Sequence, residues 1–165
     1  MVVFFTTISM AEIVIEFFKD YGYLGMGVLA FLSGSIIPIT SEVLLVFFLK
    51  LGLNAVGITL AATIGNTLGG ITCFLIGYVT TREKVQKLFK IPEKRMKRAN
   101  ILIQKYGYWT ASISFVPLIG EALLVMLGVM RVDKYKVIAV MAAGKLIRYI
   151  FITVSYTGLS AFFEI

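Results

Sequence analysis

The chain has 165 residues, of which 59% are hydrophobic, and it carries a formal net charge of +7, no histidine and one cysteine, Cys73. Water-soluble domains are roughly half apolar, so this composition and a mean hydropathy of +0.92 predict a single membrane domain, residues 1–165. The composition excludes histidine-ligated zinc, a Ser-His-Asp triad, a Cys-His pair and an intrachain disulfide. We therefore expect no metal and no cofactor.

The N-terminal residues 1–22 lack the basic n-region and the clear cleavage site of a signal peptide. Within them, residues 10–20 mix charged side chains with Ile, Val and Phe at a spacing typical of an amphipathic helix on the membrane surface. A short tilted span that begins near Val2 is the alternative.

Residues 23–80 predict a helical hairpin followed by a full span. The apolar segments 23–37 and 40–51 are each too short for a bilayer core of about 30 Å, and Pro38 lies between them. Proline removes a backbone donor and disfavours helix in the preceding residue, so we expect a re-entrant hairpin that breaks at Pro38. The span follows at 54–80, where Gly65 and Gly69 share one face and allow another helix to approach closely.

The charge is concentrated in residues 82–105, which contain nine Lys or Arg and two Glu; nine minus two is +7, so the rest of the chain is neutral. We expect this segment to be helical on each side of Pro92 and to lie on the membrane surface. A basic connection between two spans marks the cytoplasmic side, which predicts a multi-pass protein of the cytoplasmic (inner) membrane. Nucleic-acid binding is not expected, because membrane segments flank the basic residues.

Residues 106–163 repeat the layout of residues 23–80. Short apolar arms at 108–116 and 118–130 flank Pro117, a polar turn occupies 131–136, and a second full span covers 137–163.

The two halves align without a gap at an offset of 79 residues. The offset superimposes Pro38 on Pro117, Glu42 on Glu121, Leu44, Leu45 and Val46 on Leu123, Leu124 and Val125, and Gly65 on Gly144. Each unit has one hairpin that returns to its own side and one span that crosses, so the second unit starts on the opposite side. The expected fold is an all-α integral membrane protein, an inverted repeat of two re-entrant hairpins each followed by a transmembrane helix, plus amphipathic interfacial helices.

Two acids and two bases are expected at the depth where the two breaks meet. Glu42 and Glu121 each follow a proline by four residues, and Lys145 and Arg148 share one face of the last span. An unpaired cation there costs roughly 2.5–3.5 kcal/mol, so Arg148 is expected to pair with one glutamate, and Lys145 with the other or with the cytoplasmic interface. Asn66 aligns with Lys145 at the same offset.

These polar residues have two interpretations. In a substrate site, the two cations would bind an anionic headgroup and the two carboxylates would exchange protons. In a structural role, the prolines would be kinks in a bundle, the glutamates would complement helix dipoles, and the charges would form a buried network that fixes packing. The sequence leaves both open, although intramembrane carboxylates usually face a cavity.

The motifs PITSE at 38–42, GNTLGG at 65–70 and VPLIGE at 116–121 resemble the DedA/VTT membrane family, also called the SNARE-associated Golgi family, and its YqaA-like branch. The resemblance covers roughly residues 10–156 and implies two opposed re-entrant hairpins. It also implies lipid translocation, with undecaprenyl phosphate recycling in bacteria and phospholipid scrambling in eukaryotes; some members are linked to proton-coupled transport. The family's second hairpin usually carries arginines three residues before and after its proline, where this chain has Ser114 and Gly120. Lys145 and Arg148 are expected to supply the positive charge instead.

The sequence therefore predicts a non-enzymatic membrane protein that moves lipids with anionic, phosphate-bearing headgroups, in the manner of a flippase or scramblase. Participation of protons and formation of a homodimer are left open. The alternatives are a proton-coupled transporter of a small solute and a non-transporting membrane assembly or scaffold protein.

Overall fold

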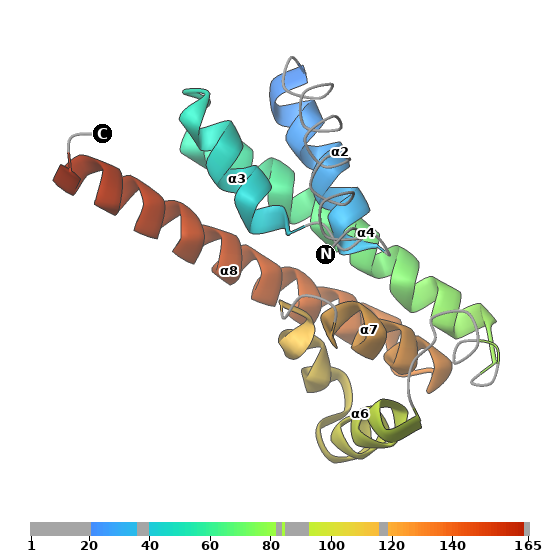
Figure 1. Ribbon diagram of the computed structural model, residues 1–165. Coiled ribbons are helices and arrows are strands. Elements are labelled where there is room, and N and C mark those ends of the chain that lie inside the picture. Colours follow the sequence, from blue (N-terminus) through green and yellow to red (C-terminus); the bar gives the residue numbers. More distant parts are fainter. Residues whose placement is uncertain (1–20, 36–39, 82–83, 85–92, 116–118, 164–165) are drawn as a thin grey trace, which may run out of the picture.

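The computed structural model describes residues 21–35, 40–81, 84, 93–115 and 119–163, and every element within them is a helix (Figure 1). In chain order the elements are α2 (Gly22–Gly34), α3 (Ser41–Lys50), α4 (Ala55–Val79), α6 (Glu93–Tyr106), the 3₁₀ helix η2 (Gly107–Phe115), α7 (Ile119–Val129) and α8 (Lys134–Phe163). The expected all-α class is confirmed. The helix expected at 10–20, the breaks expected at Pro38 and Pro117, and Pro92 lie outside the described residues.

Among the described elements, α4 and α8 are long and apolar enough to cross a membrane. Each begins at a side-chain cap: Asn54 Oδ1 accepts from the main-chain N–H groups of residues 56 and 57, and Asp133 Oδ1 accepts from those of residues 135 and 136. Because Asp133 is an N-cap, residues 134–136 are already helical. The polar turn expected at 131–136 is therefore shorter than the sequence indicated, and the last span begins three residues earlier.

The two long helices lie side by side and antiparallel (Figure 1). Near the start of α4, the hydroxyls of Thr59 and Thr153 are 2.7 Å apart. Farther along α4, the main-chain oxygen of Asn66 accepts a hydrogen bond from Lys145. As the contacts advance along α4 they move backwards along α8, which fixes the antiparallel direction.

Helix α2 runs beside the first half of α4, and glycines set their close approach. The Tyr23 hydroxyl accepts a hydrogen bond from the main chain of Asn54, where α4 begins. A Cβ atom added to Gly65 would lie 2.0 Å from the main-chain oxygen of Gly27, and one added to Gly69 would lie 2.4 Å from that of Phe31. Real Cβ atoms do not come this close, so Gly65 and Gly69 face α2.

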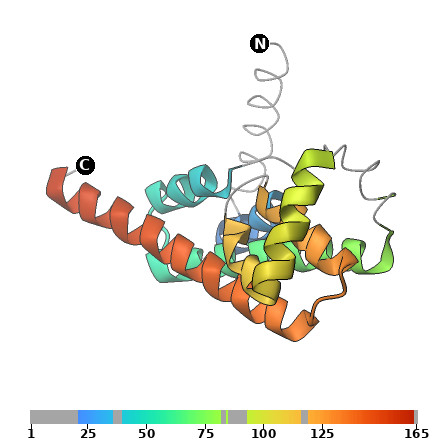
Figure 2. The same ribbon diagram turned by 90° about the horizontal axis from the view of Figure 1, so that it is seen from below.

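Helix α3 runs in the opposite direction to α2, back toward the end of the molecule where α4 begins (Figure 1). Helix α7 lies along the second half of α4, again with backbones in contact: a Cβ on Gly77 would lie 1.9 Å from the main-chain oxygen of Val125. The segment η2 lies along the start of α8, and α6 packs on η2 and α7 at that end (Figure 2).

The arm expected at 108–116 is a 3₁₀ helix, which periodicity did not predict. A 3₁₀ helix rises about 2.0 Å per residue and an α-helix about 1.5 Å. The 9 residues of η2 therefore extend over roughly 18 Å, and the 13 residues of α2 extend over roughly 20 Å, so the two helices have similar lengths.

The buried apolar side chains form two clusters with polar residues between them. One cluster joins α2, α3, the start of α4 and the later part of α8, with Phe48, Ile58 and Tyr149 as members. The other joins the end of α4 to α6, η2, α7 and the start of α8, with Phe74 and Val137 as members. Residues 63–70 of α4 and 142–148 of α8 lie between these clusters, and this stretch contains the candidate site.

Candidate functional site

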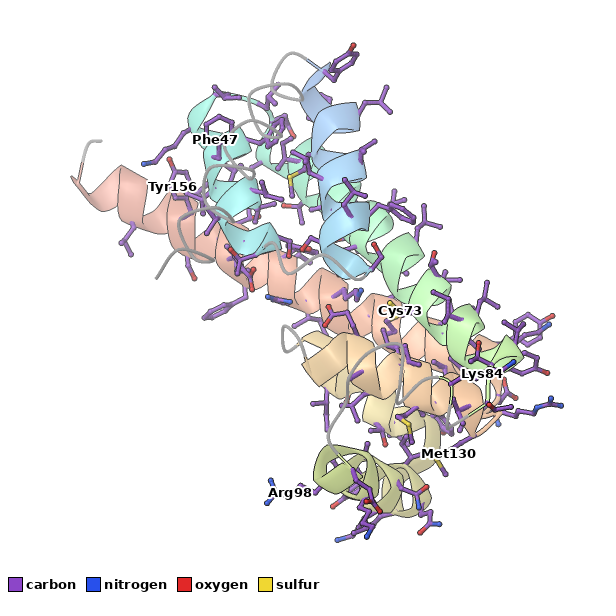
Figure 3. The ribbon with its side chains drawn as sticks, turned by 45° about the vertical axis from the view of Figure 1, so that its right-hand side comes forward. Phe47, Cys73, Lys84, Arg98, Met130 and Tyr156 are labelled. Carbon is purple, nitrogen blue, oxygen red and sulfur yellow. The ribbon has the colours of Figure 1, made fainter. Side chains whose placement is uncertain are left out.

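The candidate site lies half-way along the two long helices. In Figure 3 this level is marked by Cys73, which lies between the residues labelled at the two ends of the molecule. Helix α8 contributes Lys145 and Arg148, α4 contributes Asn66, and the first turns of α3 and α7 contribute Glu42 and Glu121. These are the residues that the sequence analysis singled out by charge and by the 79-residue offset.

Arg148 forms an ion pair with Glu42, between Nη2 and Oε1. The balance of two acids and two bases predicted that Arg148 would have a glutamate partner, and the structure identifies Glu42. The Arg148 side chain is 16% exposed and that of Glu42 is 29% exposed. This pair is therefore largely shielded but still partly accessible.

Lys145 is enclosed more completely, with only 1% of its surface exposed. Its Nζ donates a hydrogen bond of 2.5 Å to the main-chain oxygen of Asn66, and the Asn66 side chain donates one of 3.1 Å to the main-chain oxygen of Ala30. The lysine therefore connects α8 to α4, and Asn66 connects α4 to α2. A buried ammonium group with one hydrogen bond to a neutral oxygen keeps two N–H groups for other acceptors.

Glu121 acts electrostatically on both the Lys145 ammonium group and the Cys73 thiol, so it belongs to the same cluster of polar groups. The residue before it, Gly120, packs against the main chain of Ser114: a Cβ there would lie 2.3 Å from the Ser114 oxygen. The two positions where the family usually has arginines are thus in backbone contact here. An arginine at position 120 would not fit without moving η2.

Two residues near Lys145 were not predicted as part of the site. A Cβ on Gly70 would lie 2.9 Å from Lys145 Nζ and 2.5 Å from Met141 Sδ, so this glycine provides the space that the lysine occupies. The Cys73 thiol, fully buried, donates to the main-chain oxygen of Ser35, 3.2 Å away, just after α2 ends. The last glycine of GNTLGG is the sequence signal that points to Gly70; we found none for Cys73.

Buried oxygens without a hydrogen-bond partner in the part of the chain that the structure describes include Glu42 Oε2, Thr67 Oγ1 and Ser114 Oγ. Buried polar atoms in folded proteins are almost always hydrogen-bonded to protein, water or ligand. The arrangement combines two cations, two carboxylates and the hydroxyl groups of Thr67 and Ser114, which can donate hydrogen bonds, in an apolar surround. It is suited to hold an anion or to exchange protons.

The described elements are all helices, and two of them are apolar and long enough to span a membrane, which is the architecture of an integral membrane protein. No protein-family model matches the chain, and no solved structure matches it. The chain is 32% identical over 122 residues to the inner membrane protein YqaA of Escherichia coli, which covers 73% of this chain and 81% of that protein. It therefore belongs to the DedA family, as its motifs predicted.

Two other relatives have more specific names. The chain is 27% identical over 136 residues to undecaprenyl phosphate transporter A of Staphylococcus aureus, covering 75% of this chain and 67% of that protein. It is 29% identical over 134 residues to an alkaline phosphatase-like protein of Lactococcus lactis, covering 72% of this chain and 62% of that protein.

Proposed function

We propose that this protein is a membrane transporter that moves a phosphate-bearing lipid between leaflets. The observation that carries the proposal is the surroundings of Arg148. Arg148 is partly accessible, and its neighbours on α8, Ile147 and Phe151, are 68% and 73% exposed. A cation next to exposed apolar surface matches an amphiphile, with the phosphate on Arg148 and the acyl chains along α8.

In this proposal, phosphate oxygens replace the Glu42 carboxylate as the partner of Arg148. The guanidinium group offers paired N–H donors that fit phosphate oxygens. Lys145, three residues away on the same helix, supplies a second positive charge and has N–H donors left after its bond to Asn66. The name of the Staphylococcus aureus relative, an undecaprenyl phosphate transporter, supports the same class of substrate.

We further propose that the fold is an inverted repeat, with α2–α3 and η2–α7 as its two re-entrant hairpins. Support comes from the caps, because Asn54 and Asp133 are 79 residues apart and bond to main-chain groups that are also 79 apart. Asn66 and Lys145, which touch, are 79 apart as well. In two antiparallel helices related by a two-fold axis, the residue at the axis contacts its own equivalent.

The first arms of the two units also begin alike. Both start at a Tyr-Gly-Tyr sequence whose glycine has a positive φ, 54° at Gly22 and 56° at Gly107. The ring of Tyr23 lies against Gly57, and the ring of Tyr108 lies under Lys136, which is 79 residues after Gly57. Because α2 and η2 extend about equally far, the first arms of the two proposed units end at a similar depth although the second has fewer residues.

We also propose that the protein lies in the inner membrane with the α6 end toward the cytoplasm. The described exposed cations are concentrated at that end, on α6 and the start of α8, as the positive-inside rule requires of a cytoplasmic side. The name of the Escherichia coli relative supports the same membrane.

Ligand-induced stabilisation of the purified full-length chain tests the substrate class. A polyprenyl phosphate is expected to raise the melting temperature, whereas the matching polyprenol and inorganic phosphate are expected to have little effect, because the site needs charge and chain together. Arg148→Ala should remove the shift, and Lys50→Ala, at the exposed end of α3, should retain it. Equal shifts with the phosphate and the alcohol would contradict the proposal.

Proton-coupled transport of a small solute is the second candidate, and the electrostatic interaction between the Glu121 carboxylate and Lys145 is the observation that favours it. A pH gradient across proteoliposomes distinguishes the two. Lipid translocation without a gradient supports passive lipid transport. Solute uptake that requires the gradient and is lost in Glu121→Gln supports the second candidate.

A further inference from the structure

One end of the molecule, far from the candidate site, carries exposed cations and aromatic rings. The exposed cations there include Lys97, Arg98, Lys105, Arg131, Lys134 and Lys136. The acids described at this end are already engaged, Glu93 in an ion pair with Lys97 at 3.2 Å and Asp133 as the cap of α8. At the opposite end, the described exposed cation is Lys50. Figure 3 shows Lys84, Arg98 and Met130 at the basic end and Phe47 and Tyr156 at the other.

Helix α6 presents two different faces. Ala99 and Ile103 pack into the apolar cluster that also contains η2 and α7. On the other face Lys97, Ile101 and Lys105 follow one another at four-residue intervals, and Ile101 is 62% exposed between the two lysines. An apolar side chain framed by cations on an exposed helix face is the pattern of helices that lie in the headgroup region of a membrane.

Aromatic rings accompany these cations. Lys105 lies over the ring of Tyr106 at 5.2 Å from its centroid, and Arg131 lies over the ring of Tyr78 at 5.5 Å. Trp109, at the junction of α6 and η2, is 61% exposed. Tyrosine and tryptophan concentrate where a membrane meets water, so this end has the side chains of an interfacial belt.

We propose that the surface formed by Lys97, Arg98, Ile101, Lys105 and Trp109, the α6 face, binds the headgroups of anionic phospholipids. Its cations match their charge, and Ile101 and Trp109 enter the upper acyl-chain region. Lys136, at the level of this surface, is nine residues from Lys145 on α8, about 14 Å along the helix. The α6 face is therefore separate from the candidate transport site, and the proposal holds whether or not the protein transports lipid.

Trp109 is the sole tryptophan of the chain, so its fluorescence reports on this surface. The full-length protein is placed in nanodiscs of equal parts phosphatidylcholine and phosphatidylglycerol, with brominated chains on one lipid or the other. The attraction of one basic residue to an anionic lipid surface corresponds to a factor of roughly five in its equilibrium constant. Brominated phosphatidylglycerol should therefore quench Trp109 at least about twofold more strongly than brominated phosphatidylcholine. Equal quenching by the two lipids overturns the proposal.

The matched variants are the triple substitution Lys97→Gln, Arg98→Gln and Lys105→Gln, and the control Lys50→Gln. The triple variant should lose the preference for phosphatidylglycerol and the control should keep it; a triple variant that keeps it would overturn the assignment to these residues. Salt provides a test with no substitution, because 1 M salt shortens the Debye length to about 3 Å. The preference of the unmodified protein should then disappear, and its persistence would contradict electrostatic binding.

Discussion

Lys145 donates a hydrogen bond from its buried Nζ to the main-chain oxygen of Asn66, and these two residues are each other's equivalents at the 79-residue offset. Other contacts between α4 and α8 join residues with different separations, such as Thr59 and Thr153, which are 94 apart. Lys145 therefore lies where the two proposed repeat units meet, next to the space left by Gly70.

Replacing Lys145 by Met is expected to abolish lipid translocation and to lower the melting temperature. The substitution removes the cation that interacts with the Glu121 carboxylate, and removing one member of a buried charge pair is destabilising because the other charge is left uncompensated. Thermal unfolding and translocation of the same preparation measure both effects, with Lys50→Met as the control. An unchanged melting temperature would show that Glu121 does not depend on Lys145 for its stability in the fold.

A double-mutant cycle tests the ion pair between Arg148 and Glu42. Arg148→Ala and Glu42→Gln each leave a partly shielded group without its partner, so the double variant should be more stable than the sum of the two losses predicts. The expected coupling is about 1 kcal/mol, because both side chains are partly exposed. Unfolding free energies of the four proteins give this value. Additive losses would mean that the two side chains do not interact.

The close contact between α4 and α7 depends on Gly77. Gly77→Ala places a Cβ against the rigid main chain of Val125, and we expect a loss of about 1–3 kcal/mol, as for overpacked cores. Gly158, in α8, has nothing within 4 Å of an added Cβ. Gly158→Ala should therefore stabilise its helix by about 0.5–1 kcal/mol. Equal unfolding free energies for the two variants would contradict the packing described here.

The caps of the two long helices should respond alike. Asn54→Ala and Asp133→Ala each remove the oxygen that accepts two main-chain hydrogen bonds, and each is expected to cost about 1 kcal/mol. The exchanges Asn54→Asp and Asp133→Asn keep an acceptor and should keep the stability. Chemical denaturation of the four variants provides the comparison, and a large loss at only one of the two positions would argue against equivalent roles.

The helical class and the approximate helix positions followed from the sequence because apolar segments, prolines and glycines mark them directly. The charges of Glu42, Lys145 and Arg148 predicted a shared cluster, since unpaired charges in an apolar segment are costly. The start of α8 was misjudged because Lys134 and Lys136 looked like part of a turn, whereas Asp133 caps a helix that already includes them.

Other features depend on contacts between helices, which the periodicity of apolar residues along the sequence does not encode. The 3₁₀ form lets the 9 residues of η2 extend about as far as the 13 residues of α2, and the apolar pattern gave no sign of it. Gly65 and Gly69 indicated a close contact, but glycines alone do not name the partner; the structure identifies α2. Cys73 meets the end of α2 only because α2 packs along α4, so its position in the sequence was uninformative.

Lipid translocation in proteoliposomes tests the central claim most directly. The unmodified protein should move a labelled polyprenyl phosphate or phospholipid between leaflets, and folded Arg148→Ala and Lys145→Met should lose this activity while Lys50→Ala retains it. Absence of translocation by the folded, unmodified protein, with or without a pH gradient, would contradict lipid transport and favour a solute transporter or a scaffold protein.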